Sequence, residues 1–150
     1  MKSPRKTAAR KAKTWAEKLR PDMKAKLVPD RSGFGLMLVP TPMLLAEEIG
    51  RIAVGETISI SELRSRLALS HHTQSVCAMT TALFFNIVAG ASEDDMAAGR
   101  TPLAPWWRVT QPDMTLSLKT PPGPETQSER LRAEGHRVMR DPRGRWLMLS

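Results

Sequence analysis

Few side chains in this sequence can carry covalent or metal chemistry, and the strongest candidates lie in one short stretch. The stretch "HHTQSVC" holds the adjacent His71 and His72 and the only cysteine of the chain, Cys77. A thiolate is both a nucleophile and a metal ligand. Adjacent histidines on a helix cannot easily face one ion, however, and no CxxC or HxxxH spacing is present. The sequence therefore predicts no metal, cofactor or catalytic set, and it leaves Cys77 as a nucleophile or as a small buried side chain on an apolar helix.

A second stretch, "TPLAPWWRVT", places two adjacent indole rings between a proline and an arginine. An aromatic ring can stack on a nucleic-acid base, and an arginine beside it can hold a phosphate. This interpretation predicts a base pocket made of Pro105, Trp106, Trp107 and Arg108. The alternative is that the indoles pack into the core, because tryptophan is highly buried on average, or that one packs while the other is exposed. The sequence leaves these alternatives open.

The charge of the chain predicts an anionic partner. The net charge is +8 and the pI is about 10.4, which favours nucleic acid before an anionic membrane surface. Residues 1–13, "MKSPRKTAARKAK", have no acidic residue and little apolar bulk, so they are predicted to form a disordered basic arm. The arm is either a solubilising tail or a set of phosphate contacts, namely Lys2, Arg5, Lys6, Arg10, Lys11 and Lys13.

The remaining composition bounds the class of protein. A length of 150 residues suits one domain, here residues 14–150. A single cysteine excludes an intramolecular disulfide, and no apolar run is long enough to span a bilayer. The basic N-terminus is not followed by an apolar segment, so a cytoplasmic protein is expected, with no membrane partner.

Hydrophobic spacing and capping residues predict the first half of the domain. "TWAEKLR" is predicted as a short helix and "GFGLMLVP" as a buried strand. Thr41 caps a helix with Pro42 in its first turn and Gly55 as its stop. "TISISELRSRLALS" predicts a short strand and then a helix capped by Ser59, with Glu62 at capping-box spacing. The next helix is expected to begin near Thr73 and to continue toward residue 99, which completes a helix-turn-helix pattern.

The second half is predicted to be less regular. Residues 99–124 are irregular and proline-rich, with a short strand at "MTLSLK". "GPETQSERLRAEGH" predicts a helix that ends at Gly135, and the last residues predict a hairpin whose turn runs over residues 141–144. The acidic stretch "SEDDMAAG" is expected to be a solvated helix end that faces away from DNA. The fold class is α+β, a winged-helix-like helix-turn-helix domain with a small β hairpin.

The order of these motifs resembles the C-terminal domain of alkylguanine-DNA alkyltransferases. A helix-turn-helix is followed by "PWWRVT", where that family has Pro-Cys-His-Arg and then Val or Ile, and by a helix ending "LRAEGH". Small bacterial relatives with Thr-Pro-x-Trp-Arg are more similar still, because they also carry "KTW" and a Cys-x-x-Thr-Thr segment, here "CAMTT". The resemblance covers residues 13 to 150.

The resemblance implies a protein without the family's activity. Trp106 stands in place of the acceptor cysteine and Trp107 in place of the histidine, and an indole offers neither a sulfur nucleophile nor a proton-accepting nitrogen. The branch called alkyltransferase-like proteins also has Trp for Cys, and it binds alkylguanine without repairing it, although it keeps the histidine. The implied function is non-enzymatic sensing of damaged bases by a monomer on double-stranded DNA, with a repair protein as a further partner.

The resemblance also assigns DNA contacts to the second helix of the helix-turn-helix. The family's base-displacing arginine matches Gln74 and its tyrosine falls near Ile60, and neither residue type is kept. A small-residue surface on this helix would enter the minor groove, which makes Gln74, Ser75 and Ala78 the DNA-binding candidates. The helix has no Lys or Arg over residues 73–91, which favours the alternative of a protein-interaction module that has lost DNA contact. A third hypothesis is a residual alkyl acceptor at Cys77.

Overall fold

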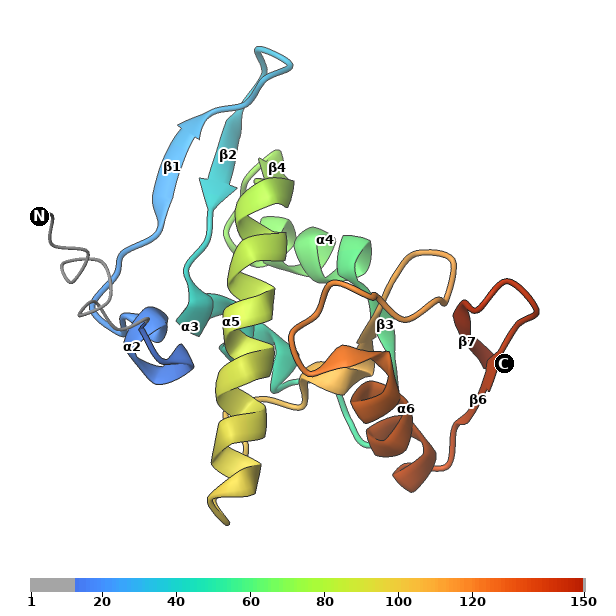
Figure 1. The fold of residues 1–150 in the computed structure, drawn as a ribbon. Helices are drawn as coiled ribbons and strands as arrows, with labels where there is room; N and C mark the ends of the chain where they lie inside the picture. The colour runs from blue at the N-terminus through green and yellow to red at the C-terminus, as the bar shows by residue number, and fades with distance from the viewer. Residues whose placement is uncertain (1–12, 150) are drawn as a thin grey trace, which may run out of the picture.

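A computed structural model describes residues 13–149 and shows a mixed α+β fold built around one long helix, α5 (Ala78–Ala97) (Figure 1). Of the predicted basic arm, only Lys13 lies within the described residues. No helix in the described range has both the length and the apolar character that crossing a bilayer requires. The α+β class is confirmed, while the winged-helix-like arrangement stays a prediction.

The N-terminal helix docks on α5 through one ring. Helix α2 (Trp15–Leu19) forms where the sequence predicts it, and Thr14 and Glu17 close a capping box at its start. Trp15 lies directly on Gly90 of α5, where an added Cβ would come within 2.4 Å of the indole. Position 90 therefore admits only glycine while α2 stays docked.

A three-stranded sheet follows, in the order β1-β2-β4. Strands β1 (Lys26–Pro29) and β2 (Leu36–Val39) form an antiparallel hairpin, and β4 (Ser75–Val76) pairs with β2 in parallel. The prediction of β2 is confirmed, whereas β1 was not predicted. Leu38 and Val76 lie on the buried face of this sheet and join the core.

The two helices after the sheet begin where their caps predict. Helix α3 (Pro42–Ile49) starts after Thr41, whose hydroxyl accepts a hydrogen bond from the Leu44 amide. It ends at Ile49, so the predicted stop at Gly55 is wrong, because turns at residues 50–52 break the helical hydrogen bonds first. Strand β3 (Ile58–Ser59) leads into α4 (Ile60–Ser70), which Ser59 caps as expected.

The predicted start of α5 is wrong. The residues from Thr73 to Cys77 do not form its first turn, because the amides of Gln74 and Cys77 donate to the carbonyls of Leu36 and Leu38 in β2. Pairing with β2 thus replaces helical hydrogen bonds, and Cys77 becomes the N-cap. The expected continuation of this helix toward residue 99 is confirmed.

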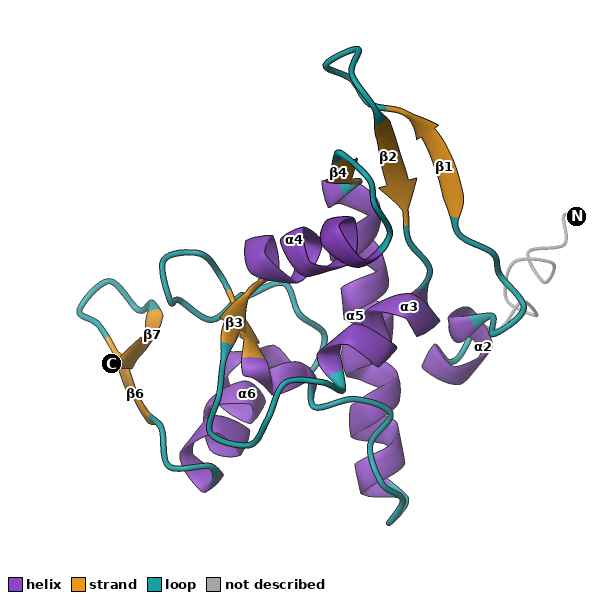
Figure 2. Cartoon of the chain, turned by 180° about the vertical axis from the view of Figure 1, so that it is seen from behind, coloured by secondary structure: helices purple, strands orange, loops and turns teal. Residues whose placement is uncertain are grey.

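The C-terminal third surrounds a short 3-10 turn, η1 (Trp106–Arg108). Strand β5 (Val109–Thr110) follows and pairs in parallel with β3, which lies between α4 and α6 when the molecule is seen from behind (Figure 2). Helix α6 (Gly123–Ala133) and the hairpin of β6 (Arg137–Arg140) and β7 (Trp146–Leu149) confirm the predictions for this region. The expected strand at "MTLSLK" is reduced to a single bridge between Thr115 and Leu147.

Candidate nucleic-acid interface

The first indole of the η1 turn is enclosed between α5 and α6. Trp106 is 0% exposed, and its Nε1 donates a hydrogen bond of 2.9 Å to a carboxylate oxygen of Glu93. Arg130 of α6 donates to the same carboxylate at 2.6 Å. Glu93 belongs to the acidic stretch that the sequence predicts as a solvated helix end, so for Glu93 that prediction is wrong. Its carboxylate, on a half-buried side chain, accepts hydrogen bonds from both η1 and α6 and so links them to α5.

The other two residues of the turn share a second carboxylate. The Nε1 of Trp107 and the guanidinium of Arg108 both donate to Glu134, at 2.9 Å and 2.7 Å. Arg108 also donates to the carbonyl of Ile52 at 2.6 Å, and it lies over the Trp107 ring. Burial raises the pKa of Glu134, but the hydrogen bonds from Arg108 and Trp107 outweigh burial and hold that pKa below its ordinary value.

The backbone of the turn is fixed as firmly as its side chains. The side-chain amide of Gln127, which is itself buried, donates to the carbonyls of Trp107 and Val109. The two indoles meet edge to face, with ring centroids 6.3 Å apart. Trp106 presents no face on which a base could stack, and Arg108 is occupied by internal acceptors. Pro105 is half-buried, and Trp106, Trp107 and Arg108 are buried. The residues predicted as a base pocket are thus packed into the core in this structure, as the alternative interpretation expects.

The predicted DNA-binding residues of α5 lie elsewhere. Gln74 and Ala78 are exposed and Ser75 is half-buried, and all three gather where β4 passes into α5. Trp106 instead contacts α5 at Glu93, 15 positions further along the helix, which is about 22 Å at 1.5 Å per residue. The structure therefore does not bring the two predicted parts of the site together.

The first half of α5 leaves one face uncovered. Met79 is 78% exposed and Leu83 is 59% exposed, and the small side chains of Ala78 and Ala82 lie between them on the exposed side. No charged residue occurs on α5 before Glu93. Thr81 and Phe85 form the buried face of this half of α5 instead. The result is a smooth, uncharged helical surface that could approach a partner closely.

Cys77 lies at the start of this surface rather than inside an apolar helix, so that expectation is corrected. The thiol is half-buried at the N-cap of α5, and its Sγ accepts a hydrogen bond of 3.2 Å from the hydroxyl of Thr80. Hydrogen bonds from Thr80 lower the pKa of the Cys77 thiol, and the positive charge of Arg31 contributes in the same direction. His71 and His72 take no part, and no metal-binding group of three or more His, Cys, Asp or Glu is found among residues 13–149.

We expect the Cys77 thiol to react with iodoacetamide at neutral pH faster than an ordinary cysteine. A lowered pKa means that a larger fraction of the thiol is thiolate at neutral pH. As the pH is lowered, the modification rate should therefore fall at a lower pH than it does for free cysteine. Replacing Thr80 by valine removes the hydroxyl, so the midpoint of the rate profile should move to higher pH. Mass spectrometry of the modified protein across a pH series measures this, with Thr101→Val, an exposed threonine beyond the other end of α5, as the matched control. Identical profiles for wild type and Thr80→Val would contradict the assignment.

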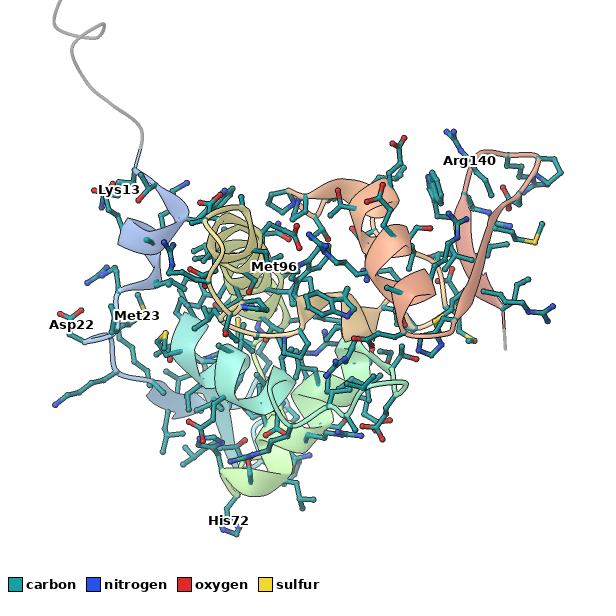
Figure 3. The ribbon with its side chains drawn as sticks, turned by 90° about the horizontal axis from the view of Figure 1, so that it is seen from below. Lys13, Asp22, Met23, His72, Met96 and Arg140 are labelled. Atoms are coloured by element: carbon teal, nitrogen blue, oxygen red, sulfur yellow. The ribbon has the colours of Figure 1, made fainter. Side chains whose placement is uncertain are left out.

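Two of the surface hairpins carry basic residues that form no ion pair with another described residue. Lys24, Lys26 and Arg31 accompany the β1–β2 hairpin, and Arg137, Arg140 and Arg143 lie on the β6–β7 hairpin. Within the described range, none of these six forms a salt bridge. Seen from below, the segment from Lys13 to Met23 and the hairpin of Arg140 lie on opposite sides of the molecule (Figure 3). Only the first group adjoins α5: Lys24 and Lys26 line a groove of about 510 Å³ whose other wall includes Thr80 and Phe84.

Comparison with known proteins identifies the fold. No protein-family model and no curated protein sequence matches the chain. Among solved structures, the fold is similar to that of S. pombe Atl1, which was crystallised in complex with damaged DNA containing O6-carboxymethylguanine. The TM-score is 0.51 at 14% sequence identity, and the similarity covers 72% of this chain and 87% of that chain. At this identity the comparison concerns the fold, and it confirms the fold that the resemblance to alkyltransferase-like proteins predicts.

Proposed function

We propose that this protein is a non-enzymatic DNA-binding protein of the alkyltransferase-like type, which contacts the duplex through the first half of α5. The observation that carries the proposal is the uncovered face from Ala78 to Leu83 in a fold similar to that of a protein crystallised on DNA. Small and apolar side chains let a helix approach the floor of a groove closely, while phosphates are held by residues around it. The absence of an acidic side chain on this half of α5 removes any repulsion of the phosphates.

The η1 turn supports the non-enzymatic part of the proposal. The position that would need a thiolate for alkyl transfer holds Trp106, whose ring N–H already donates a hydrogen bond to Glu93. The neighbouring Trp107 and Arg108 are likewise committed to Glu134. The turn therefore acts as a structural brace, and we expect recognition of the duplex without a base pocket at this turn.

The charge distribution supports an electrostatic contribution to affinity. Five of the 23 Lys and Arg residues lie among the first 12 residues, whereas all 15 acidic residues lie after them. Neutralising six phosphates would give a log–log salt slope of roughly −5. We expect Lys2, Arg5, Lys6, Arg10, Lys11 and Lys13 to supply much of that slope, together with the cations of the β1–β2 hairpin.

A fluorescence-anisotropy titration of the full chain with a short duplex, at two salt concentrations, tests this function. We expect salt-steep binding, and a shallower slope when the five basic residues before position 12 are changed to glutamine. The matched control is Arg51→Gln, which removes a cation already paired with Glu47 and Glu48 and should leave the slope unchanged. Absence of binding at low salt, or binding that ignores salt, would overturn the proposal.

The same titration separates plain duplex binding from damage sensing. We expect equal affinity for matched duplexes with and without one O6-alkylguanine, because Trp106 has no free face. A lesion preference that Trp106→Ala abolishes and Trp106→Phe retains would instead establish the base-pocket function that the resemblance implies. Because both variants lose stability, their folded state is checked by circular dichroism before the titration.

The exposed side chains of Met79 and Leu83 favour one second candidate, a protein-interaction module. Apolar side chains this exposed on one helix face are typical of a surface that a partner helix covers. In that case the full chain would fail to bind DNA at low salt, and Leu83→Glu would abolish capture of the partner. Under the DNA-binding proposal, Leu83→Glu weakens DNA binding by placing a negative charge against the phosphates.

A further inference from the structure

We propose that the β1–β2 hairpin is a second DNA-contacting element, which inserts Phe34 as an apolar wedge between base pairs beside the start of α5. The inference rests on the proposed DNA-binding function. Phe34 is 74% exposed at the tip of the hairpin and is one of only three phenylalanines in the chain. Proteins that bind the minor groove often insert such a side chain at a base step and kink the duplex there.

The turn that carries Phe34 is held by its own hydrogen bonds. The carboxylate of Asp30 accepts from the amide and from the hydroxyl of Ser32, and the Ser32 hydroxyl in turn accepts from the amide of Phe34. Hydrogen bonds from Ser32 and Ser75 keep the pKa of Asp30 below its ordinary value, so the carboxylate stays charged and bonded. Gly33 and Gly35 both have positive φ, at +87° and +71°, which the tight turn requires. The Phe34 ring is thus presented to solvent on a preformed turn.

The same turn is attached to the beginning of α5. Asp30 accepts a hydrogen bond from the hydroxyl of Ser75 in β4. Gly35 abuts Gln74, since a Cβ added at Gly35 would lie 3.1 Å from the Cβ of Gln74. Figure 1 shows the hairpin projecting beyond β4 and α4, past the end at which α5 begins. Phe34 therefore lies next to the predicted DNA-binding residues and extends beyond them.

The charges around the hairpin select DNA as the partner. Lys24, Lys26 and Arg31 have no ion-pair partner among residues 13–149. Of the acidic residues near these cations, Asp30 is bonded within its turn and Glu47, which lines a pocket with Lys24, is paired with Arg51. Asp22 is the remaining acidic residue beside Lys24 and Lys26.

Arg31 shares the turn with Phe34, while Lys24 and Lys26 lie at the base of the hairpin, where Lys26 pairs with Val39. An exposed aromatic ring at one end of a row of free cations complements a base step with phosphates running away from it. Phe34 is more exposed than the other exposed apolar side chains of the hairpin, Leu27 at 56% and Leu36 at 43%, and it alone has a ring that can stack on a base.

The test uses the full chain and a duplex that carries 2-aminopurine, whose fluorescence rises when it is unstacked. We expect wild type to bind and to raise the fluorescence. Phe34→Ala should lose that rise and bind about tenfold more weakly with an unchanged salt slope, while Phe34→Trp should retain both signals. Arg31→Gln should reduce the salt slope by about one and keep the fluorescence rise. Val54→Ala, a 71% exposed side chain on the loop between α3 and β3, is the matched control and should change nothing.

Each outcome decides the inference. If wild type binds the duplex without raising the 2-aminopurine fluorescence, or if Phe34→Ala retains both affinity and signal, the wedge is overturned while the DNA-binding function stands. If wild type does not bind the duplex at low salt, the proposed function fails and the wedge fails with it. Because Phe34 is exposed, Phe34→Ala should keep the urea unfolding midpoint of wild type, which shows that any lost signal does not come from unfolding.

Discussion

Replacing Trp106 by alanine is expected to lower the free energy of unfolding by about 3–5 kcal/mol. The indole is fully buried where α5, η1 and α6 meet, so its removal leaves a large cavity among three elements. It also removes one of the two residues that donate to the Glu93 carboxylate, which keeps only Arg130, and the lost hydrogen bond adds to the destabilisation. Urea unfolding monitored by circular dichroism measures the change.

Two further variants separate the cavity from the hydrogen bond. Trp106→Phe keeps most of the ring but cannot donate, and we expect it to lose roughly half as much stability as Trp106→Ala. Val54→Ala removes a mostly exposed side chain and should change stability by less than about 0.5 kcal/mol. A Trp106→Ala variant that unfolds at the wild-type urea concentration would show that η1 is not part of the core.

Removing one partner of the Arg108–Glu134 pair is expected to destabilise the fold by about 3–5 kcal/mol. Both side chains are mostly buried, and Arg108 also donates to the carbonyl of Ile52. Arg108→Met leaves the mostly buried Glu134 carboxylate with Trp107 as its one remaining side-chain donor. The double variant Arg108→Met with Glu134→Gln should lose less than the sum of the single variants, because each change relieves the unpaired group that the other creates. Urea unfolding of the three variants gives the coupling.

The Arg108–Glu134 pair also predicts how the free energy of unfolding changes at acidic pH. The pKa of Glu134 is lowered in the folded protein, so its stabilising contribution is fully present above the unfolded-state pKa and is lost as pH falls through the folded-state pKa. Glu134→Gln should therefore flatten the acidic side of the stability curve. Glu62→Gln, which breaks an exposed pair with Arg66, is the control and should cost less than about 1 kcal/mol at neutral pH. Equal losses for the two pairs would contradict the burial argument.

Local chemistry in the sequence was sufficient for the elements whose ends are set by neighbouring residues. Thr41 and Ser59 cap α3 and α4 through their own hydroxyls, and Gly135 follows α6 with the positive φ expected of a helix stop. The start of α5 was mispredicted because its amides bond to β2, about 38 residues earlier in the chain. Strand β1 was missed for a similar reason, since its residues form a strand only against β2.

The candidate site was predictable in its residue types but not in its contacts. The adjacent tryptophans and Arg108 marked an unusual turn, and the packing alternative described its surroundings. Their acceptors, Glu93 and Glu134, lie 13 and 27 positions away from the indoles they bind, and no local pattern links them. Phe34 was overlooked because an aromatic residue between two glycines indicates a turn, whereas its exposure depends on how far the hairpin extends beyond the core.

Strand β4 has a mechanical consequence, because it joins the hairpin to the first turn of α5. The amides of Gln74 and Cys77 are bonded to β2, and Ser75 is bonded to Asp30, so a ligand that displaces the hairpin must break these bonds or move the start of α5 with it. Cys77 sits at that joint and is the only thiol in the chain. The rate at which a reagent modifies the Cys77 thiol should therefore change when a ligand moves the hairpin and the start of α5 together.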